Sequence, residues 1–178
     1  MCSIGITFSS CTEEVVDPCD GIVCVNGDCI NGDCDCEQGW SGSDCSTQST
    51  PLSMSITSIK ITRFPATDSN GAGWDFLDGA DVYVKITDAS GIIGIETGYL
   101  ENADPQQDHT FTTSTWQTNN DLAEVTAQYT ITAYDYDVID VDDFLGAINF
   151  TPYAAQGGFP STQTLDAGGA VAFEVNYS

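Results

Sequence analysis

The sequence predicts an all-β protein, in which a small disulfide-rich module precedes an antiparallel β-sandwich. Short segments with period-two alternation recur between turn-rich stretches from residue 54 to residue 178. No stretch in that region shows a sustained 3.6-residue period, which argues against helices. Six of the eight cysteines fall between residues 19 and 45. This density indicates a disulfide framework or a metal knot in a separate small unit.

Residues 1–11 are small, apolar and uncharged, and Thr12-Glu13-Glu14 follows them. The segment Phe8-Ser9-Ser10-Cys11 resembles a bacterial lipobox, and the acidic residues after it resemble the export signal of Bacteroidetes surface lipoproteins. This resemblance implies lipid attachment at Cys11 and an outer cell-surface location. No positively charged region precedes the segment, so the true start of a leader would lie upstream. The alternative is an ordinary disordered terminus with two spare cysteines.

Residues 12–18 are expected to be a linker, and residues 19–45 carry the cysteine module. Its spacing is C-x4-C-x4-C-x4-C-x-C-x8-C, without the C-x-x-C pairs that favour zinc. Six cysteines allow 15 connectivities. The run from Cys34 to Cys45, with its C-x-C, aromatic and glycine-before-cysteine order, resembles the C-terminal half of an EGF-like domain. The resemblance implies the pairs Cys19–Cys29, Cys24–Cys34 and Cys36–Cys45.

A module this short buries too little apolar surface to fold without cross-links. Three disulfides persist only outside the reducing cytosol, so the protein is expected to be extracellular. Asp17-Pro18-Cys19-Asp20 matches the calcium-binding EGF-like subtype poorly, which favours a metal-free spacer. Residues 46–54 are rich in Ser and Thr and contain Pro51, and they read as a second linker.

Residues 55–178 are expected to form the sandwich. Ile59 and Ile61 alternate with polar residues, and the same period recurs in residues 82–86 and 171–177. About 125 residues of such short strands are typical of two packed antiparallel sheets.

The most acidic stretch, residues 133–146, puts five aspartates into nine residues and contains no Lys or Arg. Each pair of carboxylates about 4 Å apart costs roughly 1 kcal/mol in water and several-fold more near a protein surface. A loop of this kind is either fully solvated or holds a cation. Ligands that are all carboxylates suit a hard ion with six to eight oxygens, which indicates Ca²⁺ before Mg²⁺.

Asp135-x-Asp137, followed by Asp143-Phe144-Leu145-Gly146, resembles the third calcium loop of a C2 domain. A second match lies upstream, where Asp75 and Asp81 are six apart and 81–85 reads Asp-Val-Tyr-Val-Lys, with Val in place of the usual proline. The resemblance implies a C2-like β-sandwich that binds Ca²⁺ through Asp75, Asp81, Asp135, Asp137 and Asp143, with Asp68, Asp78 and Asp140 as further candidates. Asp140 and Asp142 are expected to face solvent, although either could add a ligand.

This interpretation requires the loops at Asp81 and Asp135 to meet at one end of the sandwich. The first loop is longer than the family norm, so Asp68 or Asp78 could compete with Asp75. Trp74 in that loop either inserts into a bilayer interface or packs beneath its own loop, and packing is favoured.

The net charge of −24, from 27 acidic and three basic residues, excludes nucleic acid as a partner. It also excludes attraction to anionic lipid through a basic patch. No G-x-S-x-G elbow or Ser-His-Asp arrangement is visible, so an enzyme is not expected.

The sequence therefore favours a non-enzymatic, calcium-binding surface protein. Its bound Ca²⁺ would bridge to an anionic lipid, glycan or protein. The alternative is a structural adhesin or filament subunit in which Ca²⁺ only stabilises the sandwich. A hydrolase is a distant third.

Overall fold

A computed structural model describes residues 16–74, 79–139, 141–153 and 159–178. The chain divides into two compact units, Met1–Gln48 and Ser49–Ser178. Among the predicted site residues, Cys11, Asp75, Asp78 and Asp140 lie outside the described residues. Within the described part there is no α-helix, and hence no helix that could span a membrane.

The first unit is built on two short hairpins. Strands β1 (Gly27–Ile30) and β2 (Asp33–Cys36) pair with each other, as do β3 (Trp40–Ser41) and β4 (Thr47–Gln48). Disulfides join Cys19 to Cys29, Cys24 to Cys34 and Cys36 to Cys45, which are the pairs that the EGF-like resemblance implies. Since β4 pairs with β3, the first residues of the expected 46–54 linker belong to this unit.

In the second unit, the described residues form ten strands and a short 3₁₀ helix, η1 (Thr113–Thr115). In chain order its strands are β5 (Met54–Arg63), β6 (Ala80–Asp88), β7 (Ile93–Glu96), β8 (Leu100–Ala103), β9 (His109–Thr112), β10 (Asp121–Leu122), β11 (Tyr129–Asp135), β12 (Asp143–Phe150), β13 (Thr162–Leu165) and β14 (Ala172–Tyr177).

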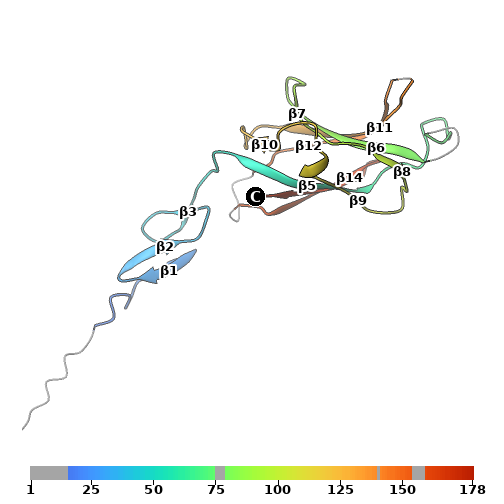
Figure 1. Cartoon of the computed structure of the whole chain (residues 1–178). Helices are drawn as coiled ribbons and strands as arrows, with labels where there is room; N and C mark the ends of the chain where they lie inside the picture. The colour runs from blue at the N-terminus through green and yellow to red at the C-terminus, as the bar shows by residue number, and fades with distance from the viewer. Residues whose placement is uncertain (1–15, 75–78, 140, 154–158) are drawn as a thin grey trace, which may run out of the picture. The chain divides into compact units, whose positions relative to one another are not determined.

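These ten strands form two antiparallel sheets (Figure 1). One sheet has the order β10-β5-β14-β13, and β9 also pairs with β5. The other has the order β12-β11-β6-β7, and β8 also pairs with β6. The two sheets lie face to face as layers, which confirms the predicted all-β sandwich.

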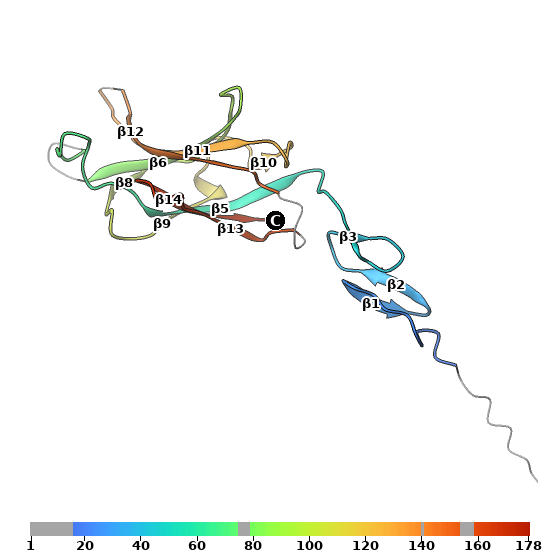
Figure 2. The same cartoon turned by 180° about the vertical axis from the view of Figure 1, so that it is seen from behind.

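The core lies between the two sheets and follows the period-two pattern. On β6, Val82, Val84 and Ile86 point inward and are fully buried, and Ile59 and Ile61 on β5 are equally buried. Their alternation in sequence places one set of side chains per strand on the inner face. Figures 1 and 2 show the loop that follows β5 and the β11–β12 loop at the same end of the sandwich.

Gly146 occupies a tight position on β12, beside a bulge at which the register with β11 shifts between Ala133 and Tyr134. A Cβ added to Gly146 would lie 2.8 Å from Val171 Cγ1, which is closer than real carbon atoms approach, and the Gly146 φ angle is +155°. Because Ala133 pairs with Gly146 and Tyr134 with Phe144, the extra residue of this bulge is Leu145 on β12.

We expect Gly146→Ala to lower the free energy of unfolding by about 1–3 kcal/mol, because the new methyl group overpacks against Val171. Denaturant titration of the full chain measures this loss. Gly169→Ala is the matched control, since nothing lies within 4 Å of a Cβ at that exposed turn. Equal stability of the two variants would contradict the packing argument.

Candidate functional site

Three of the predicted ligand positions lie at one edge of the second sheet, on neighbouring strands. Asp81 is near the start of β6, Asp135 ends β11 and Asp143 begins β12. In the strand register, Asp135 is directly opposite Asp143 on one side and Val82 on the other. The loops that carry the two acidic motifs therefore do meet at one end of the sandwich.

A short hydrogen bond joins the two loops directly. The backbone N–H of Asp81 donates to Asp135 Oδ1 at 2.6 Å, and the N–H of Tyr136 donates to the Asp81 carbonyl oxygen at 2.9 Å. These contacts connect residues that are more than fifty positions apart in sequence. They fix the base of the β11–β12 loop against the start of β6.

Asp135 is the most unusual of these residues, because its side chain is 0% exposed. Asp135 shares the inner face of β11 with Tyr129, Ile131 and Ala133, which precede it at every second position. It therefore occupies a core-facing position at the strand end. Burying a carboxylate costs several kcal/mol unless it is hydrogen-bonded and its charge is balanced. The hydrogen bond from the Asp81 N–H offsets part of this cost.

Asp81 is positioned by a neighbour that sequence reasoning did not identify. Its Oδ1 accepts the backbone N–H of Asn102 at 2.9 Å, and Asn102 Oδ1 accepts the N–H of Gly79 at 3.3 Å. Asn102 has φ +55°, a left-handed conformation that asparagine tolerates better than most residues. No sequence signal distinguishes this asparagine, because its partners come from a different strand.

The β11–β12 loop is held at its base by Asp142. Its Oδ1 accepts the backbone N–H of Asp137 at 3.2 Å, and its Oδ2 accepts the hydroxyl proton of Tyr83. Burial and this hydrogen bond raise the pKa of Tyr83 well above its usual range. The expectation that Asp142 faces solvent is therefore wrong, because its carboxylate accepts a hydrogen bond from Tyr83 on β6.

In the long loop between β5 and β6, Asp68 organises its own turn. Its Oδ1 accepts the backbone N–H groups of Asn70 and Ala72, each at 2.8 Å. The bond from Ala72 is the largest of the effects that lower the pKa of the Asp68 carboxyl. Trp74 donates its indole N–H to the Pro65 carbonyl oxygen at 2.6 Å and packs against the core. It packs beneath its loop, as favoured.

The described residues contain no group of three or more Asp, Glu, His or Cys side chains close enough to hold a metal ion. Three of the expected contributors, Asp75, Asp78 and Asp140, lie outside those residues. The described aspartates at this edge offer only oxygen donors. By chemistry, this donor set fits Ca²⁺ or Mg²⁺ and not zinc.

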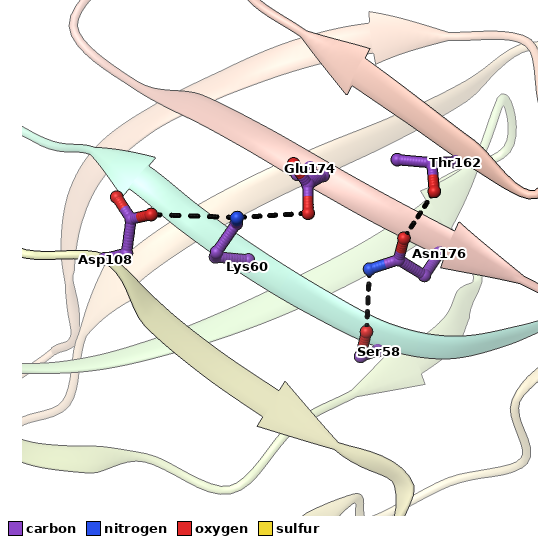
Figure 3. Close-up of polar contacts among 6 residues, drawn as sticks. All are labelled: Ser58, Lys60, Asp108, Thr162, Glu174 and Asn176. Carbon is purple, nitrogen blue, oxygen red and sulfur yellow. Dashed lines mark hydrogen bonds and ion pairs between the residues drawn. The ribbon is translucent and has the colours of Figure 1, made fainter.

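All three basic residues of the chain form ion pairs with carboxylates that are not among the predicted calcium ligands. Lys60 lies between Asp108 and Glu174, with Nζ–O distances of 3.6 and 3.1 Å, as Figure 3 shows. The same figure shows a neutral ladder beside it, in which Asn176 bonds to both Ser58 and Thr162.

The other two basic residues pair in the same way. Arg63 contacts Asp166 at 2.6 Å, and Lys85 contacts Glu96 at 3.6 Å. These exposed or half-exposed pairs contribute little to stability. Among the residues that the structure describes, no lysine or arginine forms an ion pair with the aspartates at the loop end.

The tip of the β11–β12 loop is apolar. Val138, Ile139 and Val141 are 84%, 98% and 82% exposed, and Phe144 beside them is 60% exposed. A cluster of branched apolar side chains in water, flanked by carboxylates, is typical of an interaction site. The aspartates of this loop were predicted from the sequence as calcium ligands, whereas no role was predicted for the hydrophobic residues between them.

No protein-family model matches the chain, and no curated protein matches it. Among solved structures, it is similar to human GIVD cytosolic phospholipase A2 in complex with methyl gamma-linolenyl fluorophosphonate and terbium chloride, at 14% identity and a TM-score of 0.44. That match covers 70% of this chain but only 17% of the phospholipase chain.

Two further similar structures are those of C2 domains. The C2A domain of plant Extended Synaptotagmin 1 has 16% identity and a TM-score of 0.37, with coverage of 73% of this chain and 97% of that one. A C2 domain protein from Ramazzottius varieornatus has 11% identity and a TM-score of 0.38, with coverage of 70% and 88%. These similarities concern the fold alone.

The lowered pKa of Asp68 predicts a pH-dependent contribution to stability. Because the folded-state value lies below the ordinary 3.8, this contribution is present above that pH and is lost as the pH falls through the folded-state pKa. Asp68→Asn removes the charge and keeps an acceptor oxygen. We expect the difference in Tm between the wild type and this variant to be constant above about pH 5 and to shrink below the ordinary pKa.

Thermal unfolding from neutral to acidic pH measures that difference. Glu124→Gln, an exposed substitution outside the loop, controls for the loss of one negative charge from a chain of net charge −24. A difference that grows with acidification would contradict the assigned role of Asp68.

Proposed function

We propose that this protein is a non-enzymatic, calcium-binding cell-surface protein whose C2-like loops hold Ca²⁺ and bridge it to an anionic partner. The supporting observation is the contact between Asp81 and Asp135, which brings two acidic loops together at one end of the sandwich. Carboxylates from distant segments gather at a cost that a divalent cation offsets.

The proposed ligands are Asp81, Asp135, Asp137 and Asp143, with Asp75 as the fifth. Asp68 is a poor candidate, since its Oδ1 already accepts two backbone N–H groups of its own turn. Since the three basic side chains are paired with other carboxylates, the positive charge at this end would come from solution.

Of the anionic partners, a lipid surface has the most support. The exposed tip residues Val138, Ile139 and Val141 would bury apolar area in a membrane interface. The carboxylates beside them would repel an anionic surface until Ca²⁺ neutralises them. The ion would thus make docking dependent on calcium, and the apolar tip would supply much of the binding energy.

The cysteine module and the N-terminal segment complete the proposal. The module would act as an EGF-like, metal-free spacer, and its three disulfides fit an extracellular location. Cys11 would carry the lipid anchor of a Bacteroidetes-type lipoprotein. Mass spectrometry of the native protein tests this, and an unmodified chain beginning upstream of Cys11 would contradict it.

A structural role for calcium is the second candidate. Asp135 accepts the backbone N–H of Asp81, so its carboxylate already ties one loop to the other. A cation added there would stiffen the end of the sandwich. In that case the protein would be an adhesin or filament subunit whose partner binds elsewhere.

Isothermal titration calorimetry of the full chain should show Ca²⁺ binding with a dissociation constant of roughly 10⁻⁴–10⁻³ M, as in other extracellular modules. The double variant Asp137→Asn and Asp143→Asn should weaken binding by roughly tenfold or more, because affinity follows the number of charged ligands. Glu124→Gln should leave it unchanged. Absence of Ca²⁺ uptake by the wild type at millimolar concentration would exclude the proposal.

Replacing Val138, Ile139 and Val141 with serine separates the two roles. We expect the wild type to sediment with phosphatidylserine vesicles in calcium and not in EDTA, and the triple variant to lose most of this sedimentation. The triple variant should still bind Ca²⁺ in calorimetry, since no ligand is altered. A calcium-raised Tm without sedimentation of the wild type would instead favour the structural role.

A further inference from the structure

A small pocket opens on the outer face of the β12-β11-β6-β7 sheet, away from the core. It has a volume of about 170 Å³. This is well below the roughly 300–1,000 Å³ of pockets for drug-sized ligands, so the pocket suits one small ring. Its lining residues are Tyr83, Lys85, Glu96, Thr97, Tyr99, Gln117, Tyr136 and Asp142.

Aromatic rings form one part of this pocket. Tyr99 stacks on Tyr136 with ring centroids 4.6 Å apart and an interplanar angle of 11°, yet Tyr99 remains 45% exposed. Below them, Tyr83 stacks on Tyr134 at 5.4 Å and meets Tyr136 edge to face at 6.4 Å. Stacking restrains each ring through its neighbour, and the pocket thus has a rigid aromatic surface already formed.

Polar groups of both kinds surround these rings. Lys85 Nζ lies 5.0 Å from the Tyr83 ring centroid and 3.6 Å from Glu96 Oε2, so it is held from two sides. The Gln117 side chain offers an acceptor and two donors, and the backbone N–H of Gln117 is bonded to the Glu96 carbonyl oxygen. Asp142 is fixed by the Tyr83 hydroxyl.

The charges in the pocket select among ligand classes. The pocket lining contains two carboxylates, Glu96 and Asp142, and a single lysine, Lys85, which forms an ion pair with Glu96. A phosphate or carboxylate ligand would meet net negative charge. Lys85 lies over the faces of Tyr83 and Tyr134, within 5.3 Å of both ring centroids, so it blocks those two faces to an added cation and its own charge would repel one. A neutral ligand with many hydroxyl groups fits best.

We propose that this pocket is a binding site for a neutral sugar ring, distinct from the proposed calcium ligands although Tyr136 and Asp142 of its lining lie in the β11–β12 loop. The apolar C–H face of the sugar would rest against Tyr99. Its hydroxyl groups, each both donor and acceptor, would bond to Glu96, Gln117 and Asp142. Specificity of this kind rests on polar groups that would lose hydrogen bonds with a ligand lacking the hydroxyls. The protein would then recognise a glycan by the sheet face and not by its loop ends.

The test is an NMR titration of the full chain, in EDTA, with the methyl glycosides of glucose, galactose and mannose. At least one glycoside should shift the amide resonances of Tyr99, Gln117 and Tyr136, with a dissociation constant of ~1 mM. Tyr99→Ala should weaken binding by roughly tenfold, and Tyr99→Phe should keep most of it, because the ring is retained. Gln117→Ala should weaken binding, whereas Gln128→Ala, at an exposed position just before β11 and outside the pocket, should not.

Three results would overturn the proposal. These are no shifts with any glycoside, equal shifts in the wild type and Tyr99→Ala, or shifts with tetramethylammonium chloride and none with a glycoside. Because the titration is run in EDTA, it tests the pocket without bound calcium. The Asp137→Asn and Asp143→Asn variant should keep sugar binding, which distinguishes failure of one proposal from failure of the other.

Discussion

A fully buried carboxylate at the end of β11 organises the functional end of this molecule. Asp135 lies on the core-facing side of its strand and accepts the backbone N–H of Asp81 at 2.6 Å. This hydrogen bond joins two loops whose bonded residues are more than fifty positions apart in the sequence. The inner-face alternation of β11 puts the carboxylate there, and the β6–β11 register puts the amide beside it. The acidic loops consequently share one edge, and any cation bound there would act on both.

The β11–β12 loop also connects that edge to the outer face of the sheet. At its base, Asp142 accepts bonds from the Asp137 backbone and from the Tyr83 hydroxyl, so one carboxylate belongs to both regions. The loop thereby carries three kinds of group within a few residues: carboxylate oxygens, exposed apolar side chains and part of an aromatic pocket. Its two ends enter paired strands, which fixes the base of the loop, while Val138, Ile139 and Val141 remain exposed.

Much of the fold could be predicted because period-two alternation is local. The inward residues of β5, β6 and β14 were readable from sequence, and the cysteine spacing with its EGF-like resemblance gave the disulfide pairs present in the first unit. The Asp-rich loops were recognisable as a pair through their resemblance to the calcium loops of C2 domains. The contacts of Asn102 and Tyr83 were not predicted, and the prediction that Asp142 faces solvent was wrong. Each depends on a contact across strands, and one strand's pattern does not reveal its neighbour's side chains.

By itself, the sequence determined the charge, the all-β class, the cross-linked module and the two acidic motifs, because each follows from residue type and spacing along the chain. Only the tertiary structure decided that Asp81 contacts Asp135, that Asp142 turns to Tyr83 and that Tyr99 stacks on Tyr136. Those outcomes depend on strand order and register. Register is set by the packing of the whole inner face, and that is a property of all the strands together.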